Sequence, residues 1–193
     1  MKILPVLFIL ILTSCSNEVP LEVPIEQTVT RNNIKYLVNS EEPFTGTIVS
    51  YNEKGRLYEK TNFKDGQPNG LYEIFHDNGQ LSGKGNFKDG QMNGPFEDFH
   101  ENGQLSGKGN YKDGQLNGPF EQFHDNGQLR QKRNWKDGQI EDGLHESYYK
   151  NGQLEIKENR KDGQRDGLRE GYYENGELWF IENWKDGKLL GEK

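Results

Sequence analysis

One short motif recurs through most of this chain at a nearly constant interval. The motif is Asn-Gly-Gln/Glu-Leu, and its glycines are Gly79, Gly103, Gly127, Gly152 and Gly176, with a degenerate copy at Gly55. A second motif, Lys-Asp-Gly, repeats at the same interval of 24 residues, lengthened once to 25 by an extra residue within 139–142. A fixed period of this length is typical of a repeat protein, here with about six copies between Phe44 and Lys193.

Each copy reads as a β-hairpin. In one copy, residues 71–76 and 81–88 are each of strand length, and Asn78-Gly79 separates them. Asn and Gly tolerate the positive φ angles of tight primed hairpin turns, so we expect this turn at Asn-Gly. The sequence therefore predicts an all-β fold of tandem hairpins, an elongated, twisted, single-layer antiparallel meander. About twelve strands at ~4.8 Å would make it roughly 55–60 Å long.

Centring the turn on Asn78-Gly79 predicts the cross-strand register. It sets Glu73 opposite Lys84, and this pairing of opposite charges recurs in later copies until Glu170 would meet Ile181. It also sets Phe75 opposite Ser82 and His76 opposite Leu81, although a bulged turn would shift this register. Because side chains alternate along strands, the sequence predicts two faces. One holds Tyr72, Ile74, His76, Leu81, Gly83, Gly85 and Phe87, and the other holds Glu73, Phe75, Lys84, Asn86 and Lys88.

Composition excludes several classes of protein. The chain has 24 glycines and no alanine, which argues against a helical fold. Its net charge of -7 argues against nucleic-acid binding, which depends on clustered Lys and Arg. The carboxylates recur in every copy, whereas an active site is normally singular, so we expect no enzyme activity.

The N-terminal residues resemble a targeting signal. Lys2 and the apolar run 3–12 indicate a signal peptide, too short to span a bilayer. Leu12-Thr13-Ser14-Cys15 resembles the lipobox of bacterial lipoproteins, which implies cleavage before Cys15 and lipidation of that cysteine. Ser16 then favours the outer membrane of a Gram-negative cell. We expect a signal peptide at 1–14, a lipidated flexible tether at 15–30, a capping strand region at 31–45 with a strand at 34–38, and repeats at 46–193.

The repeat unit itself resembles a known family. Gly-x-aromatic-x-x-aromatic-x-x-Asn-Gly-Gln-Leu, followed by Asn-aromatic-Lys-Asp-Gly, is similar to the bacterial variant of the MORN repeat found in YwqK-family antitoxins. The resemblance covers about 44–193. It implies a non-catalytic ribbon of β-hairpins used as a scaffold or binding surface.

Metal sites are not expected. His76, His100 and His124 share one column, but equivalent strands lie about 9.6 Å apart, too far for ligands of one zinc ion. The Asp-rich turns lack the spacing of a calcium loop, and turn chemistry explains their composition. We therefore expect no metal, cofactor or small-molecule substrate.

One aromatic column is the candidate binding site. It consists of Tyr51, Phe75, Phe99, Phe123, Tyr148 and Tyr172, beside the paired charges. These rings either bind a partner or merely stack along the ribbon. An apolar stripe with charged edges is typical of a protein-contact patch, so we expect a lipid-anchored scaffold that binds a protein. An antitoxin that neutralises an envelope toxin and a glycan-binding module are the alternatives.

Overall fold

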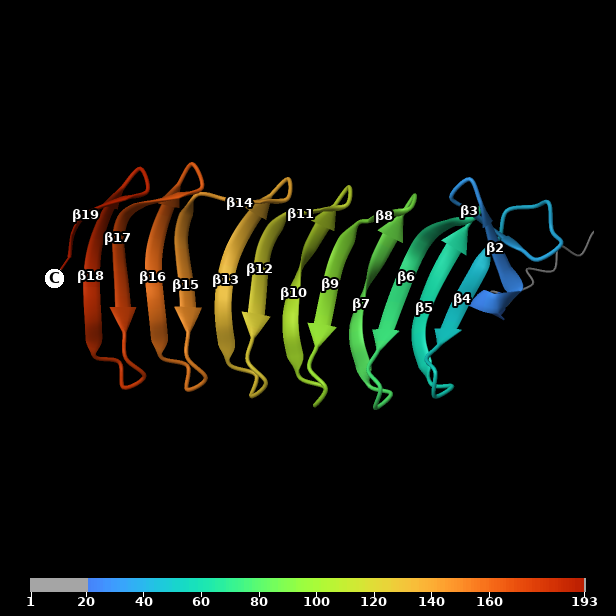
Figure 1. Cartoon of the computed structure of the whole chain (residues 1–193), viewed down its shortest axis with the longest axis horizontal. Coiled ribbons are helices and arrows are strands. Elements are labelled where there is room, and N and C mark those ends of the chain that lie inside the picture. The colour runs from blue at the N-terminus through green and yellow to red at the C-terminus, as the bar shows by residue number, and fades with distance from the viewer. Residues whose placement is uncertain (1–20, 193) are drawn as a thin grey trace, which may run out of the picture.

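The computed structural model describes residues 21–192 (Figure 1). The expected signal peptide and Cys15 lie outside these residues. The strands are β1 (Glu22–Pro24), β2 (Thr28–Arg31), β3 (Ile34–Leu37), β4 (Gly46–Tyr51), β5 (Leu57–Lys64), β6 (Gln67–Phe75), β7 (Leu81–Lys88), β8 (Gln91–Met92), β9 (Gly94–Phe99), β10 (Leu105–Lys112), β11 (Gln115–Leu116), β12 (Gly118–Phe123), β13 (Leu129–Lys136), β14 (Gln139–Ile140), β15 (Gly143–Tyr148), β16 (Leu154–Lys161), β17 (Gln164–Tyr172), β18 (Leu178–Lys185) and β19 (Lys188–Glu192).

The predicted meander of hairpins is confirmed. Within residues 21–192, one sheet contains 17 strands, and from β4 onward the longer strands pair antiparallel in chain order. The short strands β8, β11 and β14 each pair with the strand before them. Figure 1 shows these strands side by side in an elongated ribbon, with hairpin turns along both long edges. The short strands β8, β11 and β14, together with β1 and β19 at the two ends, account for the difference from the expected twelve.

The two kinds of turn differ from the prediction. The primed two-residue turn lies at Asp-Gly, where Asp65 and Gly66 both have positive φ (50° and 76°), and this recurs in every copy. The Asn-Gly turn is longer. His76 N–H donates to Gln80 O, and Gly79 N–H donates to His76 O, each over 2.8 Å. Of the loop residues 77–79, only Gly79 has positive φ (84°), which is the pattern of a three-residue loop with a bulge.

The bulge corrects one part of the predicted register. Tyr72 pairs with Gly85 and Glu73 with Lys84, as predicted, but Phe75 pairs with Leu81 instead of Ser82. Because directly paired residues point to the same face, Leu81 joins Phe75 on the charged face rather than the face of Tyr72. The same shift occurs at the end of each repeated hairpin, for example between Phe123 and Leu129.

The N-terminal end corrects two further predictions. The strand that covers the first edge of the sheet is β1, which pairs parallel with β4 and comes from the segment expected to be a tether. The capping strand expected at 34–38 is β3, and it pairs with β2 in a separate two-stranded sheet. Val23, Phe44 and Ile48 form a small buried cluster here. Val23 of β1 thus completes a small core with Phe44 and Ile48 at this end of the sheet.

Along the rest of the ribbon, aromatic pairs on the face of Tyr72 replace a deep core. Tyr72 lies 5.2 Å from Phe87, and Phe96 lies 5.0 Å from Tyr111, between ring centroids. These rings cover glycines of the intervening strands. A methyl group at Gly109 would lie 2.7 Å from Cε1 of Phe96, so only glycine allows the ring to approach this closely. Stability therefore depends on neighbouring copies, as in other repeat arrays.

Across residues 21–192, no helix has the length and apolar character needed to cross a bilayer.

Candidate functional site

The predicted aromatic column forms one continuous apolar stripe with a leucine column. Each aromatic residue pairs across its hairpin with a leucine, as Phe99 does with Leu105 and Tyr148 with Leu154. The stripe therefore carries one apolar side chain on each of twelve successive strands. We call the following residues the apolar stripe: Tyr51, Leu57, Phe75, Leu81, Phe99, Leu105, Phe123, Leu129, Tyr148, Leu154, Tyr172 and Leu178.

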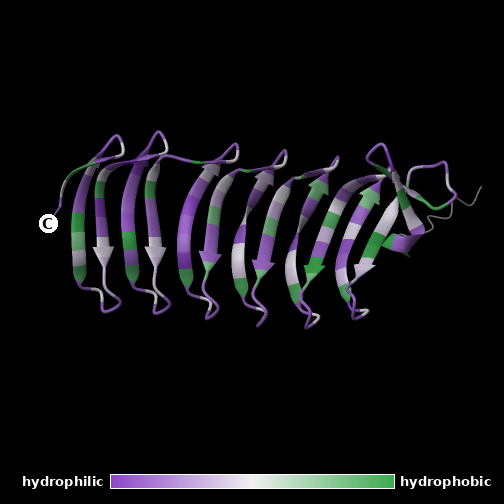
Figure 2. Cartoon of the chain, viewed as in Figure 1, coloured by the Kyte–Doolittle hydropathy of each residue, from purple (hydrophilic) through white to green (hydrophobic). Residues whose placement is uncertain are grey.

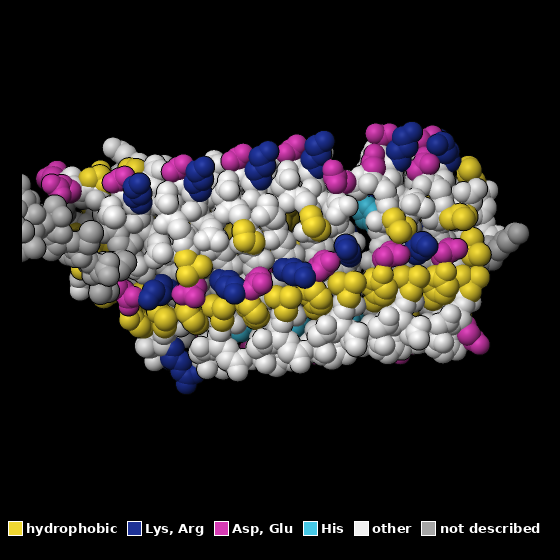
Figure 3. Space-filling model, turned by 180° about the vertical axis from the view of Figure 1, so that it is seen from behind, with side chains coloured by type: hydrophobic (Ala, Val, Ile, Leu, Met, Phe, Trp, Pro, Cys, Tyr) yellow, Lys and Arg dark blue, Asp and Glu magenta, His cyan; other side chains and the backbone are white. Residues whose placement is uncertain are grey.

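The apolar stripe is open to solvent along its whole length. None of its side chains is buried, and the two at its ends, Tyr51 and Leu178, are each 49% exposed. Figure 3 shows an unbroken yellow band along the ribbon, and Figure 2 shows green segments near one end of many strands. Such a contiguous, partly exposed apolar band makes the stripe the candidate interaction surface.

A row of alternating charges lies beside the stripe. Each of the longer strands from β5 to β17 contributes one residue, and Lys alternates with Glu from one strand to the next. We call this row the charge ladder: Lys60, Glu73, Lys84, Glu97, Lys108, Glu121, Lys132, Glu146, Lys157 and Glu170. The ladder ends where Glu170 pairs with Ile181, as predicted. Figure 3 shows the alternating blue and magenta side chains next to the yellow band.

The charge ladder also holds the rings of the stripe. Nζ of Lys84 lies 5.8 Å from the ring centroid of Phe99, and Nζ of Lys108 lies 5.6 Å from that of Phe123. Two stripe tyrosines instead donate from their hydroxyls to ladder glutamates, Tyr148 to Glu146 over 2.8 Å and Tyr172 to Glu170 over 3.0 Å. Burial, together with the hydrogen bond and charge of Glu146, raises the pKa of Tyr148. The rings are thus oriented before any partner arrives.

The histidine column joins neighbouring copies. Nε2 of His76 lies 2.8 Å from Phe99 O, and the same bond links His100 to Phe123 and His124 to Tyr148. A carbonyl oxygen only accepts hydrogen bonds, so Nε2 of each ring carries the proton. Each of these histidines therefore ties its loop to the backbone beneath the next aromatic residue of the stripe.

The opposite face changes character toward the C-terminus. Glu158, which is 8% exposed, accepts from Nε of Arg160 over 2.8 Å and from Nε of Arg165 over 3.0 Å. Arg169 Nη1 donates to Glu182 over 2.8 Å. Burial by itself raises the pKa of Glu158, but the hydrogen bonds and charges of Arg160 and Arg165 outweigh it and hold the pKa below its usual value.

Sequence reasoning missed this charged group. Glu158 occupies the position that glycine holds in earlier copies, at Gly85 and Gly109, and Arg169 occupies the position of Phe96. These substitutions become visible in the sequence when every equivalent position of the repeats is compared, and not the motif residues alone. Because Glu158 and Glu182 accept hydrogen bonds from Arg160, Arg165 and Arg169, the group has the form of a structural network.

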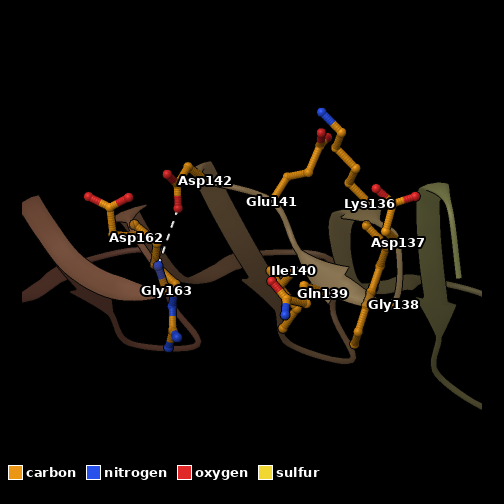
Figure 4. Close-up of a pocket in the computed structure, with 11 residues that line it drawn as sticks. Lys136, Asp137, Gly138, Gln139, Ile140, Glu141, Asp142, Asp162 and Gly163 are labelled. Atoms are coloured by element: carbon orange, nitrogen blue, oxygen red, sulfur yellow. Dashed lines mark hydrogen bonds between the residues drawn. The ribbon is translucent and has the colours of Figure 1, made fainter. Parts of the chain in front are cut away.

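One hollow lies at the extra residue of the fifth copy. It has a volume of about 900 Å³ and is lined by residues 135–142, Arg160, Asp162 and Gly163 (Figure 4). In the preceding copy, Gly138 N–H donates to Leu116 O over 3.0 Å. Here Gly163 N–H donates instead to the Asp142 carboxylate over 3.3 Å. A side chain thus replaces the backbone bond that the insertion displaced, which explains the hollow without a ligand.

Comparison with known proteins agrees with this architecture. Five segments match the family described as MORN repeat variant, at residues 68–89, 92–113, 116–137, 141–162 and 165–186. Together they cover more than half of the chain. No match was found among curated proteins.

Proposed function

This chain belongs to the MORN repeat variant family, and from that premise we propose that it is a non-catalytic scaffold of the bacterial cell envelope. A lipid on Cys15 would hold it to a membrane, in the outer membrane of a Gram-negative cell. Its apolar stripe would bind another protein.

The continuous exposed stripe is the observation that carries this proposal. A ring that served only to stack along the ribbon would be expected to turn toward the backbone, yet every stripe residue stays partly exposed. Aromatic side chains are enriched where proteins contact one another, and a charged edge excludes unsuitable partners. The stripe on a preordered sheet therefore suits a long, shallow protein contact.

The repetition of the carboxylates supports a non-catalytic role. The ladder glutamates recur on strand after strand in equivalent surroundings, and Glu158, the least exposed carboxylate of residues 21–192, is bound by arginines. Neither arrangement presents one distinct acid or base beside a pocket, as catalysis requires. The ribbon therefore supplies a surface rather than a reaction centre.

The lipid anchor is supported by sequence alone, through the motif Leu12-Thr13-Ser14-Cys15. To test it, cells expressing the Cys15→Ser variant are fractionated beside wild type. We expect the variant in the soluble fraction, because several acyl chains supply the membrane affinity. Continued association of the variant with membranes would contradict the anchor.

The contact surface is tested by truncating two central rings. We expect Phe99→Ser combined with Phe123→Ser to reduce partner capture, measured by crosslinking in cells and mass spectrometry, more than it lowers the melting temperature. Tyr173→Ser is the matched control, since Tyr173 is 49% exposed and lies outside the stripe, just after the end of β17. Unchanged capture in the double variant, or a loss explained by unfolding, would show that the stripe is structural.

A further inference from the structure

The apolar stripe has a spacing that restricts which partner conformations can follow it. Its aromatic residues are separated by one leucine strand each, so successive rings lie two strand spacings apart. Strands in a sheet are about 4.8 Å apart, which places equivalent rings roughly 9.6 Å apart along the ribbon. A partner segment that lies along the ribbon must repeat at that distance to contact each ring in the same way.

Of the regular backbone conformations, the polyproline II helix matches this distance. It has three residues per turn and rises about 3.1 Å per residue, so side chains on one side recur every ~9.3 Å. An α-helix returns to the same side after seven residues, or about 10.5 Å, and loses register by nearly 1 Å at every ring. An extended strand repeats on one side every ~6.7 Å, which does not fit the rings at all.

We propose that the partner of this protein is a segment in the polyproline II conformation, lying along the apolar stripe at right angles to the strands, with proline or another apolar residue in each triplet. This inference rests on the proposed protein-binding function and specifies its partner. Flat aromatic side chains are a general surface for such segments, because the proline-rich helix is already ordered and loses little entropy on binding. Phe75, Phe99, Phe123 and Tyr148 supply four such rings in register.

The charge ladder specifies a second position in each triplet. A partner with a period of three residues meets one Lys and one Glu of the ladder per turn. The ladder lysines Lys84 and Lys108 are already held by Glu97 and Glu121, at 2.8 and 2.9 Å, and lie over stripe rings. The ladder itself carries as many lysines as glutamates, so the net charge of -7 is what favours Lys or Arg at every third residue of the partner.

Fluorescein-labelled peptides test this proposal directly with the full chain. The probes are (Pro-Pro-Lys) repeated two, four and six times, and an 18-residue peptide of the same composition with lysines spaced irregularly. We expect fluorescence anisotropy to show binding that strengthens with the number of triplets, because each triplet reaches one more ring. We expect clearly weaker binding of the irregular peptide and of (Pro-Pro-Glu) repeated six times. Equal binding of the regular and irregular lysine peptides would overturn the proposal, since net charge alone would explain it.

Variants of the protein show which residues bind the triplet peptides. Phe99→Ser with Phe123→Ser should weaken the six-triplet peptide about tenfold, because two aromatic contacts are lost. Glu97→Gln with Glu121→Gln should weaken it less and reduce its salt dependence. The controls Tyr173→Ser and Glu101→Gln should leave binding unchanged; both residues lie outside the stripe and the ladder.

The two proposals fail in different ways. If no triplet peptide binds but the stripe variant still loses its crosslinked partner in cells, the polyproline inference is wrong and the contact surface stands. If peptide binding is unaffected by the stripe variant, the peptides bind elsewhere and the inference is again wrong. If partner capture in cells is also unaffected, the proposed function fails with it.

Discussion

Nζ of Lys84 lies 2.8 Å from Oε2 of Glu97, a residue of the next hairpin, although Lys84 is also paired in register with Glu73 of its own hairpin. The same inter-hairpin contact joins Lys108 to Glu121 over 2.9 Å. The charge ladder therefore connects successive copies as well as the two strands of one copy. This matters because a hairpin of this sequence buries too little to be stable without its neighbours.

The first prediction measures that connection. In a double-mutant cycle with Lys84→Ala and Glu97→Ala, we expect a favourable coupling of about 0.3–1 kcal/mol, the range of partly exposed ion pairs. Urea unfolding of the four proteins provides the free energies. Coupling that is absent at low salt would mean that the alternating charges serve only to set register or attract partners.

The second prediction concerns the glycines beneath the rings. Alanine at Gly109 would lie 2.7 Å from Cε1 of Phe96 and 3.1 Å from Cδ2 of Phe120, so we expect Gly109→Ala to destabilise the chain by about 1–3 kcal/mol. Gly191→Ala is the matched control, because nothing lies within 4 Å of a methyl group there. Thermal unfolding compares them. A stabilising effect at Gly109 would show that the rings move aside easily.

The third prediction follows from the lowered pKa of Glu158, which arginine contacts depress despite burial. A carboxyl with a pKa lower in the folded than in the unfolded chain stabilises the fold above its unfolded value, about 4.5. This contribution is lost as pH falls through the lowered native pKa. We therefore expect Glu158→Gln to be less stable at neutral pH and to lose less stability than wild type below pH ~4.5.

Melting temperatures from neutral pH down to pH 3 check this prediction. Glu101→Gln serves as its control, because Glu101 is exposed in a loop and should leave the acid limb unchanged. If the melting temperatures of Glu158→Gln and wild type fell equally as the pH is lowered, the arginine contacts would not lower the pKa of Glu158 in the folded chain.

The fourth prediction concerns the two ends of the ribbon. Removing residues 163–193 should shorten the sheet without unfolding the rest, because each copy contacts only its neighbours. Phe44→Ala should cost more, about 3–5 kcal/mol, because Phe44 is 3% exposed in the small N-terminal cluster. Circular dichroism melts distinguish the two. Complete unfolding of the shortened chain would contradict the one-dimensional account.

Much of this architecture can be predicted from the sequence because the repeat period is visible in it. The pairing of Glu73 with Lys84 follows from the turn position and the alternation of side chains, and it is confirmed. The position of Leu81 could not be predicted in the same way. Asn-Gly is compatible both with a primed two-residue turn and with a bulged three-residue loop, and the choice reverses the face of the leucine. The sequence therefore predicts the aromatic residues of the stripe but not its leucines.

Features outside the period were harder to predict. Strand β1 forms by parallel pairing with β4, which depends on a contact between segments that no local pattern specifies. Residues 21–25 follow Pro20 and contain Pro24, so their sequence resembles a linker even though Val23 is buried. The charged group around Glu158 was missed because it changes the columns between the motifs and leaves the motifs intact.

Site-specific photo-crosslinking in cells tests the central claim most directly. A photoreactive amino acid replaces Phe123 in the apolar stripe in one protein and Tyr173, which lies outside the stripe, in the other. We predict a discrete crosslinked partner from position 123 and none from position 173, at equal protein levels. The reverse pattern, or crosslinks of equal yield from both positions, would contradict the assignment of the stripe as the contact surface.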